Sequence, residues 1–280
     1  MPTPDIADPL ELVDLASGVA RKAADLLLDG ARRSRSLVET KSTSTDMVTE
    51  MDRASEELIV AALLDARPDD GIVAEEGSAR AGTSGLRWVI DPLDGTTNYL
   101  YGHPGWAVSI AAETVAADDP DAHDSSRTVA GVVFDVVHDE LFTAAPGHGA
   151  LRNGEPIHCS DQTDVADALL ATGFGYRPER RRHQAEVLVE LLPQVRDIRR
   201  MGAAAVDLCS VACGRVDAYF ERGLGWWDLA AGSLIATEAG AVVSSLTGGP
   251  VVPSSVFAAA NGISTALRDL LGSLGVTDVS

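Results

Sequence analysis

The sequence predicts a mixed α/β fold of the α+β type, on three observations. From residue 169 onward, strand-like and helix-like runs alternate, which is typical of an α/β arrangement. Residues 107–144 carry three strand-like runs with no helical pattern between them, which is typical of antiparallel strands. Near the N-terminus, two long segments have apolar residues at helical spacing. We therefore expect one domain built from two coupled halves, about residues 1–150 and about residues 151–280.

Two helices are expected near the N-terminus. Apolar spacing predicts the first over residues 10–28, with Gly30 as its C-terminal stop. The second is expected over residues 49–66, where Thr49 and Asp52 have the spacing of a capping box. Acids at a helix start commonly complement the helix dipole, and this is the ordinary interpretation of Asp52 taken alone.

Short strands follow, and two of them end in acids. Residues 72–74 predict a buried strand that ends at Glu75 and Glu76, and residues 78–85 predict a loop. Residues 88–90 predict another buried strand, which stops at an acid followed by proline. The remaining features of this half are strands at residues 107–112, 128–135 and 140–144, an acidic loop at residues 118–126 and a hairpin turn at Asn153-Gly154.

Strands and helices alternate in the second half. Residues 223–227 interrupt the alternation, and Asp228 stands where the N-cap of the next helix is expected. The strands are expected at residues 169–172, 196–200, 216–221, 241–245 and 256–260, and the helices at residues 179–192, 203–213, 229–239 and 264–274.

The stretch 88–98 holds the strongest functional signal. Pro92 fixes its own φ and favours an extended conformation at Asp91, so Asp91 and Asp94 can converge across a tight turn. Converging carboxylates repel each other unless a cation lies between them. Gly95 and the Thr-Thr-Asn that follows supply free N–H groups and hydroxyls of the kind that hold an anion at a helix start. An Asx turn is the structural alternative, and it accounts for only one of the two aspartates.

Composition excludes several classes of function. The chain has 280 residues, of which 45% are hydrophobic, and no apolar run has the length of a membrane span. Its formal net charge of −20 gives a surface that repels nucleic-acid backbones and anionic membranes. The N-terminus lacks a basic region followed by an apolar segment, so we expect a cytoplasmic protein with neither a nucleic-acid nor a membrane partner.

Motifs for covalent catalysis are absent from the sequence. It has no G-x-S-x-G elbow, no phosphate-binding P-loop and no dinucleotide-binding glycine motif, and its histidines form no H-E-x-x-H cluster. Cys159, Cys209 and Cys213 are too scattered for a disulfide framework, and we interpret Cys209 and Cys213 as small core residues. What remains is a set of acids at strand and helix ends beside a phosphate-type turn, which indicates metal-assisted attack of water on a phosphate ester.

Four segments carry a more specific pattern. Residues 88–99 read WVIDPLDGTTNY, and residues 227–232 read WDLAAG. Residues 41–52, which begin in an exposed connection rich in Ser and Thr, have the form K-x(4)-D-x-V-T-x-x-D, and residues 74–77 read AEEG. In this order, the segments resemble the signatures of the inositol monophosphatase family. The resemblance implies a layered α-β-α-β-α sandwich and a homodimer that needs Mg²⁺ and is inhibited by lithium.

The resemblance also implies a set of metal ligands. Glu75, Asp91 and the Leu93 carbonyl would hold the metal that activates the attacking water. Asp91, Asp94 and Asp228 would hold the metal that receives the ester oxygen, so Asp91 bridges the two. Oxygen ligands of this kind suit Mg²⁺, which retains several waters in such sites.

Catalytic and substrate positions follow from the same resemblance. Asp52 and Thr96 match positions that orient the nucleophilic water, and together with Glu75 they form the implied catalytic set. The Gly95 and Thr96 amides would bind the phosphate, and Glu221 would contact the sugar alcohol. The full set of implied substrate contacts is Asp94, Gly95, Thr96, Gly202, Ala203, Ala204 and Glu221.

Three positions depart from the family pattern or have an open role. Met51 stands where the family often has threonine, and Ala203 replaces a hydroxyl residue of the G-[ST]-A-A turn. Lost hydroxyls would affect water positioning or substrate choice without removing a metal ligand. Lys41 is interpreted equally well as a surface lysine or as an active-site residue.

The sequence thus predicts Mg²⁺-dependent hydrolysis of myo-inositol 1-phosphate to inositol and phosphate, with two or three ions per site, no covalent intermediate and no organic cofactor. The alternative substrates within the family are fructose 1,6-bisphosphate, histidinol phosphate and 3′-phosphoadenosine 5′-phosphate. A regulatory or scaffold protein is the alternative from another class. The complete set of metal ligands argues against it, because a pure scaffold has no physical need for clustered acids.

Overall fold

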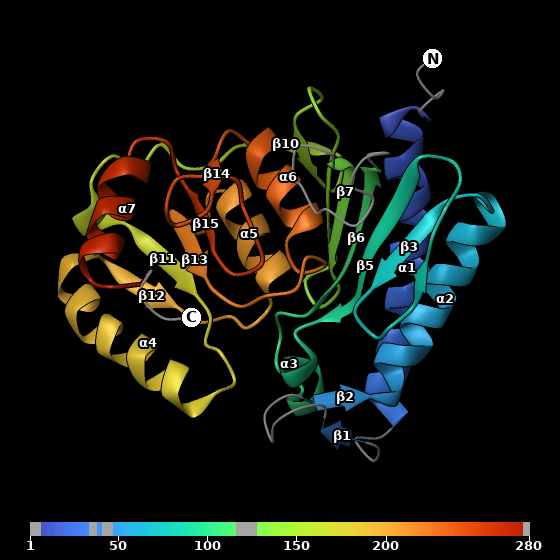
Figure 1. Ribbon diagram of the computed structural model, residues 1–280, viewed down its shortest axis with the longest axis horizontal. Helices are drawn as coiled ribbons and strands as arrows, with labels where there is room; N and C mark the ends of the chain where they lie inside the picture. The colour runs from blue at the N-terminus through green and yellow to red at the C-terminus, as the bar shows by residue number, and fades with distance from the viewer. Residues whose placement is uncertain (1–6, 34–37, 41–46, 116–127, 277–280) are drawn as a thin grey trace.

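The computed structural model describes residues 7–33, 38–40, 47–115 and 128–276, and it arranges them in alternating layers (Figure 1). From α1 and α2 on the right of the figure to α4 and α7 on the left, the layers run helix, sheet, helix, sheet, helix. The predicted α-β-α-β-α sandwich is therefore confirmed. Lys41 and the acidic loop 118–126 lie outside the described residues.

The larger sheet has eight strands in the order β10-β9-β8-β7-β6-β5-β3-β4. Its neighbours pair antiparallel except for β3 and β5, which are parallel. The Asn153-Gly154 hairpin is confirmed, and both residues have the positive φ that such a two-residue turn requires, 51° and 83°. The strands are β3 (Gly71–Ala74), β4 (Ala79–Arg80), β5 (Leu86–Asp94), β6 (Ala107–Thr114), β7 (Thr128–Asp135), β8 (Glu140–Ala144), β9 (Ala150–Arg152) and β10 (Glu155–Ile157).

Two helices, α1 (Pro9–Arg33) and α2 (Glu50–Ala66), cover the outer face of this sheet. Side chains alternate along β5, so Trp88 packs with these helices while Val89 packs toward the opposite face. The helix start predicted near Thr49 is confirmed at Glu50. A short ribbon of β1 (Val38–Thr40) and β2 (Met47–Thr49) precedes α2.

Two sequence predictions in this half are wrong. Helix α1 does not stop at Gly30 but continues to Arg33. A Cβ at Gly30 would lie 2.5 Å from Met51 Sδ and 2.7 Å from the Tyr99 hydroxyl oxygen, so glycine is needed there for close packing rather than for ending the helix. The predicted loop 78–85 contains β4, which pairs with β3 and extends the edge of the sheet.

The smaller sheet has five strands in the order β12-β11-β13-β15-β14. β11 pairs parallel with β12 and β13, as the alternating pattern predicts, and β15 is antiparallel to its neighbours. That the two sheets mark two coupled halves of one domain stays a prediction. The strands are β11 (Leu169–Thr172), β12 (Asp197–Arg199), β13 (Ala218–Glu221), β14 (Val242–Ser244) and β15 (Val256–Ala259).

Helices α5 and α6 fill the layer between the sheets, and α4 and α7 cover the outer face of the smaller sheet. Cys209 is buried in α5 and Cys213 packs partly buried at its end, which confirms both as core residues; all three cysteines are free. No helix within the described ranges has both the length and the apolarity of a membrane span. The bounds are α4 (Pro178–Leu191), α5 (Ala204–Ala212), α6 (Ala230–Glu238) and α7 (Ser264–Ser273), with short 3-10 turns at Val165–Asp167 and Leu192–Gln194.

Candidate active site

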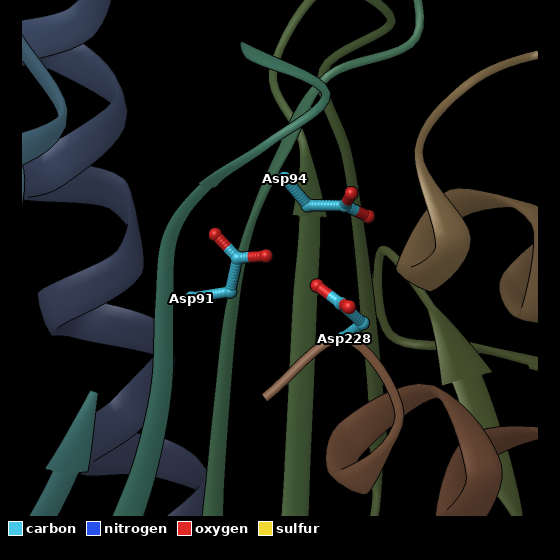
Figure 2. A group of neighbouring side chains, drawn as sticks. All are labelled: Asp91, Asp94 and Asp228. Carbon is cyan, nitrogen blue, oxygen red and sulfur yellow. The ribbon is translucent and has the colours of Figure 1, made fainter. Parts of the chain in front are cut away.

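Three aspartates converge where the two sheets approach the central helices. Figure 2 shows the carboxylates of Asp91, Asp94 and Asp228 directed toward one another, the first two from β5 and the third from the loop before α6. In the described part of the chain, their oxygens form the group of potential metal ligands that lie within 4.8 Å of one another. We call these three residues the acid cluster.

An irregularity in β5 brings Asp91 and Asp94 together. The strand does not stop at Asp91, as the sequence predicts, but continues through Pro92 to Asp94. Its register with β6 shifts between the two aspartates, because proline has no N–H to contribute to the ladder. Asp91 Oδ1 accepts a hydrogen bond from the Leu93 N–H at 3.0 Å, which stabilises this local geometry. Residues three apart in a regular strand would face opposite sides, so the bulge is what allows both carboxylates to meet.

Asp94 also joins the larger sheet to the central helix layer. Its Oδ2 accepts a hydrogen bond from the Ala205 N–H at 2.7 Å, in the first turn of α5. Ala203 occupies the N-cap position of that helix and makes no side-chain cap bond. Asp94 therefore provides, from the other half of the chain, the acceptor that the missing hydroxyl at position 203 would otherwise offer.

The prediction that Asp228 is an N-cap is wrong. Helix α6 begins at Ala230, and Leu229 occupies the cap position without a side-chain bond. Asp228 Oδ2 instead accepts from the Gly225 N–H at 2.6 Å, inside the loop that precedes the helix. This contact turns the Asp228 side chain back toward the loop and the acid cluster, as Figure 2 shows, rather than toward the helix.

Burial and mutual repulsion raise the pKa values of the whole cluster. Burial is the main cause of the raised pKa of Asp91, followed by the charges of Glu75 and Asp94. Burial and the Asp228 charge raise the pKa of Asp94, against a lowering effect of the Ala205 N–H. Burial followed by the Glu75 charge raises the pKa of Asp228 to about 7. Without a cation, burial and repulsion therefore disfavour the ionised forms of these carboxylates, and a bound cation would favour the ionised forms.

Glu75 and Leu93 lie beside the acid cluster. Glu75 follows β3, and its N–H donates to the Ile90 carbonyl at 3.1 Å, which fixes the end of β3 against β5. Glu75 is not part of the group within 4.8 Å, but both it and Leu93 line the same cleft. The Leu93 carbonyl accepts a hydrogen bond from the Thr96 hydroxyl at 3.2 Å.

Gly95 and Thr96 form the turn into α3 (Thr96–Tyr101). Gly95 has a left-handed φ of 90°, and a Cβ there would lie 2.7 Å from the Gly105 carbonyl oxygen, so both conformation and space require glycine. Gly95 and Thr96 line the cleft, as do Gly202 and Ala204 at the start of α5.

Two of the sequence-predicted site residues do not reach the cleft surface. Asp52 is buried in α2, and its charge, after the larger effect of burial, raises the pKa of Tyr99 to about 12. Ala203, at the N-cap of α5, is buried in the hydrophobic core that includes residues of α5 and α6. The structure therefore brings the predicted metal ligands and most of the predicted substrate contacts into one cleft. Asp52 and Ala203 are buried and do not line it.

The cleft has a volume of 1290 Å³ and is lined by both acidic and basic side chains. Glu221, at the end of β13, lines it and accepts a hydrogen bond from the Tyr219 hydroxyl at 2.8 Å. Burial raises the pKa of Glu221. Sequence reasoning missed the basic residues, although the run RPERRR at residues 177–182 of so acidic a chain was an available signal. The arginines that line the cleft are Arg53, Arg177, Arg180, Arg181, Arg200 and Arg222.

Sequence reasoning also missed Asp207, which lies in the buried helix α5. Both of its carboxylate oxygens are buried without a hydrogen-bond partner. Burial, followed by the charges of Glu221 and Asp94, raises its pKa well above the ordinary value. The sequence carries no signal that Asp207 is buried, since a single aspartate in a helical pattern is ordinarily solvent-exposed.

Comparisons with known proteins find relatives along almost the whole chain. The sequence matches the Inositol monophosphatase family over residues 8–273. It is 41% identical to the inositol-1-monophosphatase of Mycobacterium leprae, with 95% of each chain covered. It is 42% identical to the Nus factor SuhB of Pasteurella multocida, with 85% of this chain and 86% of the relative covered. The crystal structure of the extragenic suppressor protein suhB of Bartonella henselae has a TM-score of 0.85 at 35% identity, covering 93% of this chain and 98% of that one.

Proposed function

The chain belongs to the inositol monophosphatase family, and from this premise we propose that it hydrolyses myo-inositol 1-phosphate in a Mg²⁺-dependent reaction. The convergence of the three carboxylates of the acid cluster in one cleft is the observation that carries the proposal. Family membership supports the phosphatase class, and the substrate and the metal are our inference from the residues of the cleft.

The residues present fit a divalent cation. Asp91 Oδ2 is buried without a hydrogen-bond partner, which is costly for a carboxylate unless a cation is its partner. We propose that Glu75, Asp91 and the Leu93 carbonyl hold one ion, and that Asp91, Asp94 and Asp228 hold another. When bound, Mg²⁺ supplies a lowered pKa for the attacking water and charge stabilisation for the leaving alkoxide. An all-oxygen set of this kind favours Mg²⁺ over softer metals.

The chain's own groups would bind and orient the substrate. The Gly95 and Thr96 amides would receive the phosphoryl oxygens. Glu221 would accept hydrogen bonds from ring hydroxyls of the polyol, and its partner, the Tyr219 hydroxyl, orients its carboxylate. Asp52 lies behind the cleft surface, so we propose that it acts by positioning Thr96 and the water rather than by touching the substrate.

Several further properties belong to the same proposal. We propose a homodimer in the cytoplasm that is inhibited by lithium and uses no organic cofactor. A net charge of −20 disfavours both nucleic-acid and membrane partners. Gly202 and Ala204 would border the bound sugar alcohol from the start of α5, and Ala203 would support this turn from below.

A regulatory role is the second candidate, and one observation favours it. Relatives at about 40% identity carry the name Nus factor SuhB. The two candidates are not exclusive, but they differ in what the acid cluster must do. A regulatory role needs no turnover, whereas the phosphatase role requires turnover that depends on the metal.

The test is phosphate release from a panel of substrates with Mg²⁺, with and without EDTA. The panel contains myo-inositol 1-phosphate, fructose 1,6-bisphosphate, histidinol phosphate and 3′-phosphoadenosine 5′-phosphate. We expect release from myo-inositol 1-phosphate that EDTA abolishes and excess Mg²⁺ restores. No release from any of the four would reject the phosphatase proposal and leave the regulatory one, and release only from another member of the panel would replace the substrate.

A further inference from the structure

We propose that Glu113 is a positioning residue for the candidate metal site, because it binds the Trp226 indole and thereby fixes the loop 223–228 that carries Asp228. This inference rests on the metal site of the proposed function and adds the contacts that place one of its ligands. Glu113 and Trp226 do not line the cleft, and neither belongs to the acid cluster. Their effect on the metal would pass through the main chain of the loop.

Glu113 is a charged side chain in the interior of the larger sheet. It lies in β6 and is 0% exposed, and its cross-strand partner on β5 is Arg87, which is 6% exposed. The Arg87 Nε donates to Glu113 Oε2 at 2.9 Å. A buried ion pair is costly to desolvate, and two apolar side chains of similar volume would often stabilise a sheet as well or better. Stability alone therefore gives no reason for a carboxylate at this position.

The other oxygen of Glu113 has a partner from a distant segment of the chain. Glu113 Oε1 accepts a hydrogen bond from the Trp226 Nε1–H at 2.6 Å. The Thr128 hydroxyl, on β7, donates to the same oxygen at 3.4 Å. Trp226 is 2% exposed, and a buried indole N–H needs an acceptor. Because an ionised carboxylate is a stronger acceptor than a neutral oxygen, the ion pair with Arg87 places a strong acceptor where the indole enters the core.

The main chain on both sides of Trp226 is bound to the segment that holds Asp228. The Gly225 N–H, which precedes Trp226, donates to Asp228 Oδ2 at 2.6 Å. The Trp226 carbonyl accepts from the N–H groups of Leu229 and Ala230, directly after Asp228, at 3.1 Å and 3.0 Å. Because these bonds enclose Asp228, a displacement of Trp226 would move the Asp228 carboxylate with it.

Two contacts with β6 set the place of this loop beside the acid cluster. The Ser109 hydroxyl donates to the Trp227 carbonyl at 3.3 Å, and Ser109 is the partner of Asp91 in the pairing of β5 with β6. Glu113 lies farther along β6, and the two side chains contact successive residues of the loop. In Figure 2, Asp228 comes from a separate segment and meets the two carboxylates of β5. The distance from Asp228 to those carboxylates therefore depends on how the loop is bound to β6.

Contacts of this kind orient metal ligands without touching the metal. Their removal typically lowers metal affinity or activity by about 10- to 100-fold. Trp226→Phe removes the indole N–H donor and keeps a buried aromatic ring. We expect it to raise the Mg²⁺ concentration that gives half of the maximal rise in melting temperature by about 10-fold.

Trp88→Phe is the matched control, since the same sheet contains a second indole bound to a buried carboxylate. Trp88 Nε1 donates to Asp70 Oδ2 at 3.0 Å, and Asp70 also pairs with Arg67. Trp88 packs with the outer helices α1 and α2, whereas Trp226 packs in the core between the sheets. The two substitutions remove the same groups and should lower the melting temperature without metal by similar amounts. Trp88→Phe should change the Mg²⁺ dependence by less than about 3-fold.

The test combines a binding, a kinetic and an exchange measurement on the wild type and the two variants. Thermal unfolding is followed with increasing Mg²⁺ at constant ionic strength, and initial rates on myo-inositol 1-phosphate are measured over the same range. In Trp226→Phe, saturating Mg²⁺ should restore most of kcat, and KM for the substrate should change by less than about 3-fold. Hydrogen exchange without metal is independent of activity, and there the Gly225 N–H should exchange about 10-fold faster in Trp226→Phe and at the wild-type rate in Trp88→Phe.

Glu113→Gln is the second variant and tests the carboxylate itself. The Gln side chain can accept from the indole only by turning its NH2 group toward Arg87, so one of the two contacts is lost. This variant should raise the Mg²⁺ requirement in the same direction as Trp226→Phe, and it keeps the inference testable if Trp226→Phe fails to fold. Failure of both variants to fold would assign these contacts to stability alone and overturn the inference.

A wild-type Mg²⁺ dependence in folded Trp226→Phe would overturn this inference and leave the proposed function intact. Equal changes in Trp226→Phe and Trp88→Phe would also overturn it, since that result reflects a general loss of stability. No rise in the melting temperature of the wild type with Mg²⁺ would instead reject the metal site of the proposed function, and the inference with it.

Discussion

The acid cluster lines the same cleft as Arg177, Arg180, Arg181 and Arg200, but the two groups are built in opposite ways. The acids come from two distant segments, with Asp91 and Asp94 buried and Asp228 half-buried, and they are fixed by backbone hydrogen bonds from Leu93, Ala205 and Gly225. Three of these four arginines come from one short run, residues 177–181, and are mostly exposed. A buried cluster of like charges requires a ligand to be stable in its ionised form, whereas exposed cations with solvent around them do not. The acid cluster should therefore have the larger effect on turnover and stability.

The largest expected effect comes from removing one charge of the acid cluster. Asp94→Asn should lower turnover by at least about 1000-fold, because a lost metal ligand removes several kcal/mol of transition-state stabilisation. The melting temperature without metal should be preserved or raised, since one repelling charge is gone and the Asn oxygen can still accept from the Ala205 N–H. Steady-state kinetics and thermal unfolding check the two parts. Turnover near the wild-type value would contradict the two-metal interpretation.

Two neighbouring glutamates allow a matched comparison at the edge of the cluster. Glu75 and Glu76 both line the cleft, but of the two only Glu75 lies where its charge raises the pKa values of Asp91 and Asp228. Glu75→Gln should lower kcat by about 100-fold or more, and Glu76→Gln by less than about 5-fold. The opposite order in kinetic assays would show that the ligand register is displaced by one residue.

Glu221 lies between the two regions, and its effect should be smaller and dependent on substrate. Glu221→Ala should lower kcat/KM for myo-inositol 1-phosphate by about 10- to 150-fold, the range expected for hydrogen bonds to a charged acceptor. A substrate without ring hydroxyls, p-nitrophenyl phosphate, should lose much less. Assays of both substrates on the one variant decide the matter. Equal losses of kcat/KM on the two substrates would mean that Glu221 supports the structure or the metal sites. No loss on either substrate would mean that Glu221 does not contribute to activity.

The smallest effect concerns Asp207, a buried acid outside the cluster. Burial raises its pKa in the folded state above the unfolded value of about 3.9, so the folded state binds more protons. Its contribution to stability is therefore present below about pH 4 and is lost as the pH rises from there through the folded-state pKa. Relative to wild type, Asp207→Asn should gain about 1 kcal/mol or more in unfolding free energy between pH 4 and pH 8. Denaturant unfolding at several pH values without metal checks this, and a pH-independent difference would mean that the carboxyl is paired.

The acidic half of the site could be predicted from sequence, and the basic half could not. The turn around Pro92 predicts that Asp91 and Asp94 converge, whereas Asp228 was placed with them only through the resemblance to the inositol monophosphatase family. Arg180 and Arg200 are each ordinary surface residues in the sequence, and only the packing of α4 and the turn into α5 onto the smaller sheet brings them to one cleft.

The wrong predictions of secondary structure also arise from tertiary contacts that the sequence does not show. Gly30 lies inside α1 because Met51 and Tyr99 occupy the space of its side chain, and Pro92 lies inside β5 because a bulge accommodates it. Asp228 does not cap α6, because its carboxylate accepts a hydrogen bond from the Gly225 N–H instead. Local propensity predicts none of these, since each depends on a neighbour that the tertiary structure supplies.

Metal binding measured as stabilisation tests the central claim most directly, because it needs no substrate. Thermal unfolding of the wild type and of Asp91→Asn is followed with increasing Mg²⁺ at constant ionic strength. We expect the wild-type melting temperature to rise by about 5 °C or more at saturation, since a ligand of the folded state adds stability by mass action, and the rise to disappear in Asp91→Asn. An equal rise in the two proteins, or none in the wild type, would contradict the assignment of the acid cluster as a metal site.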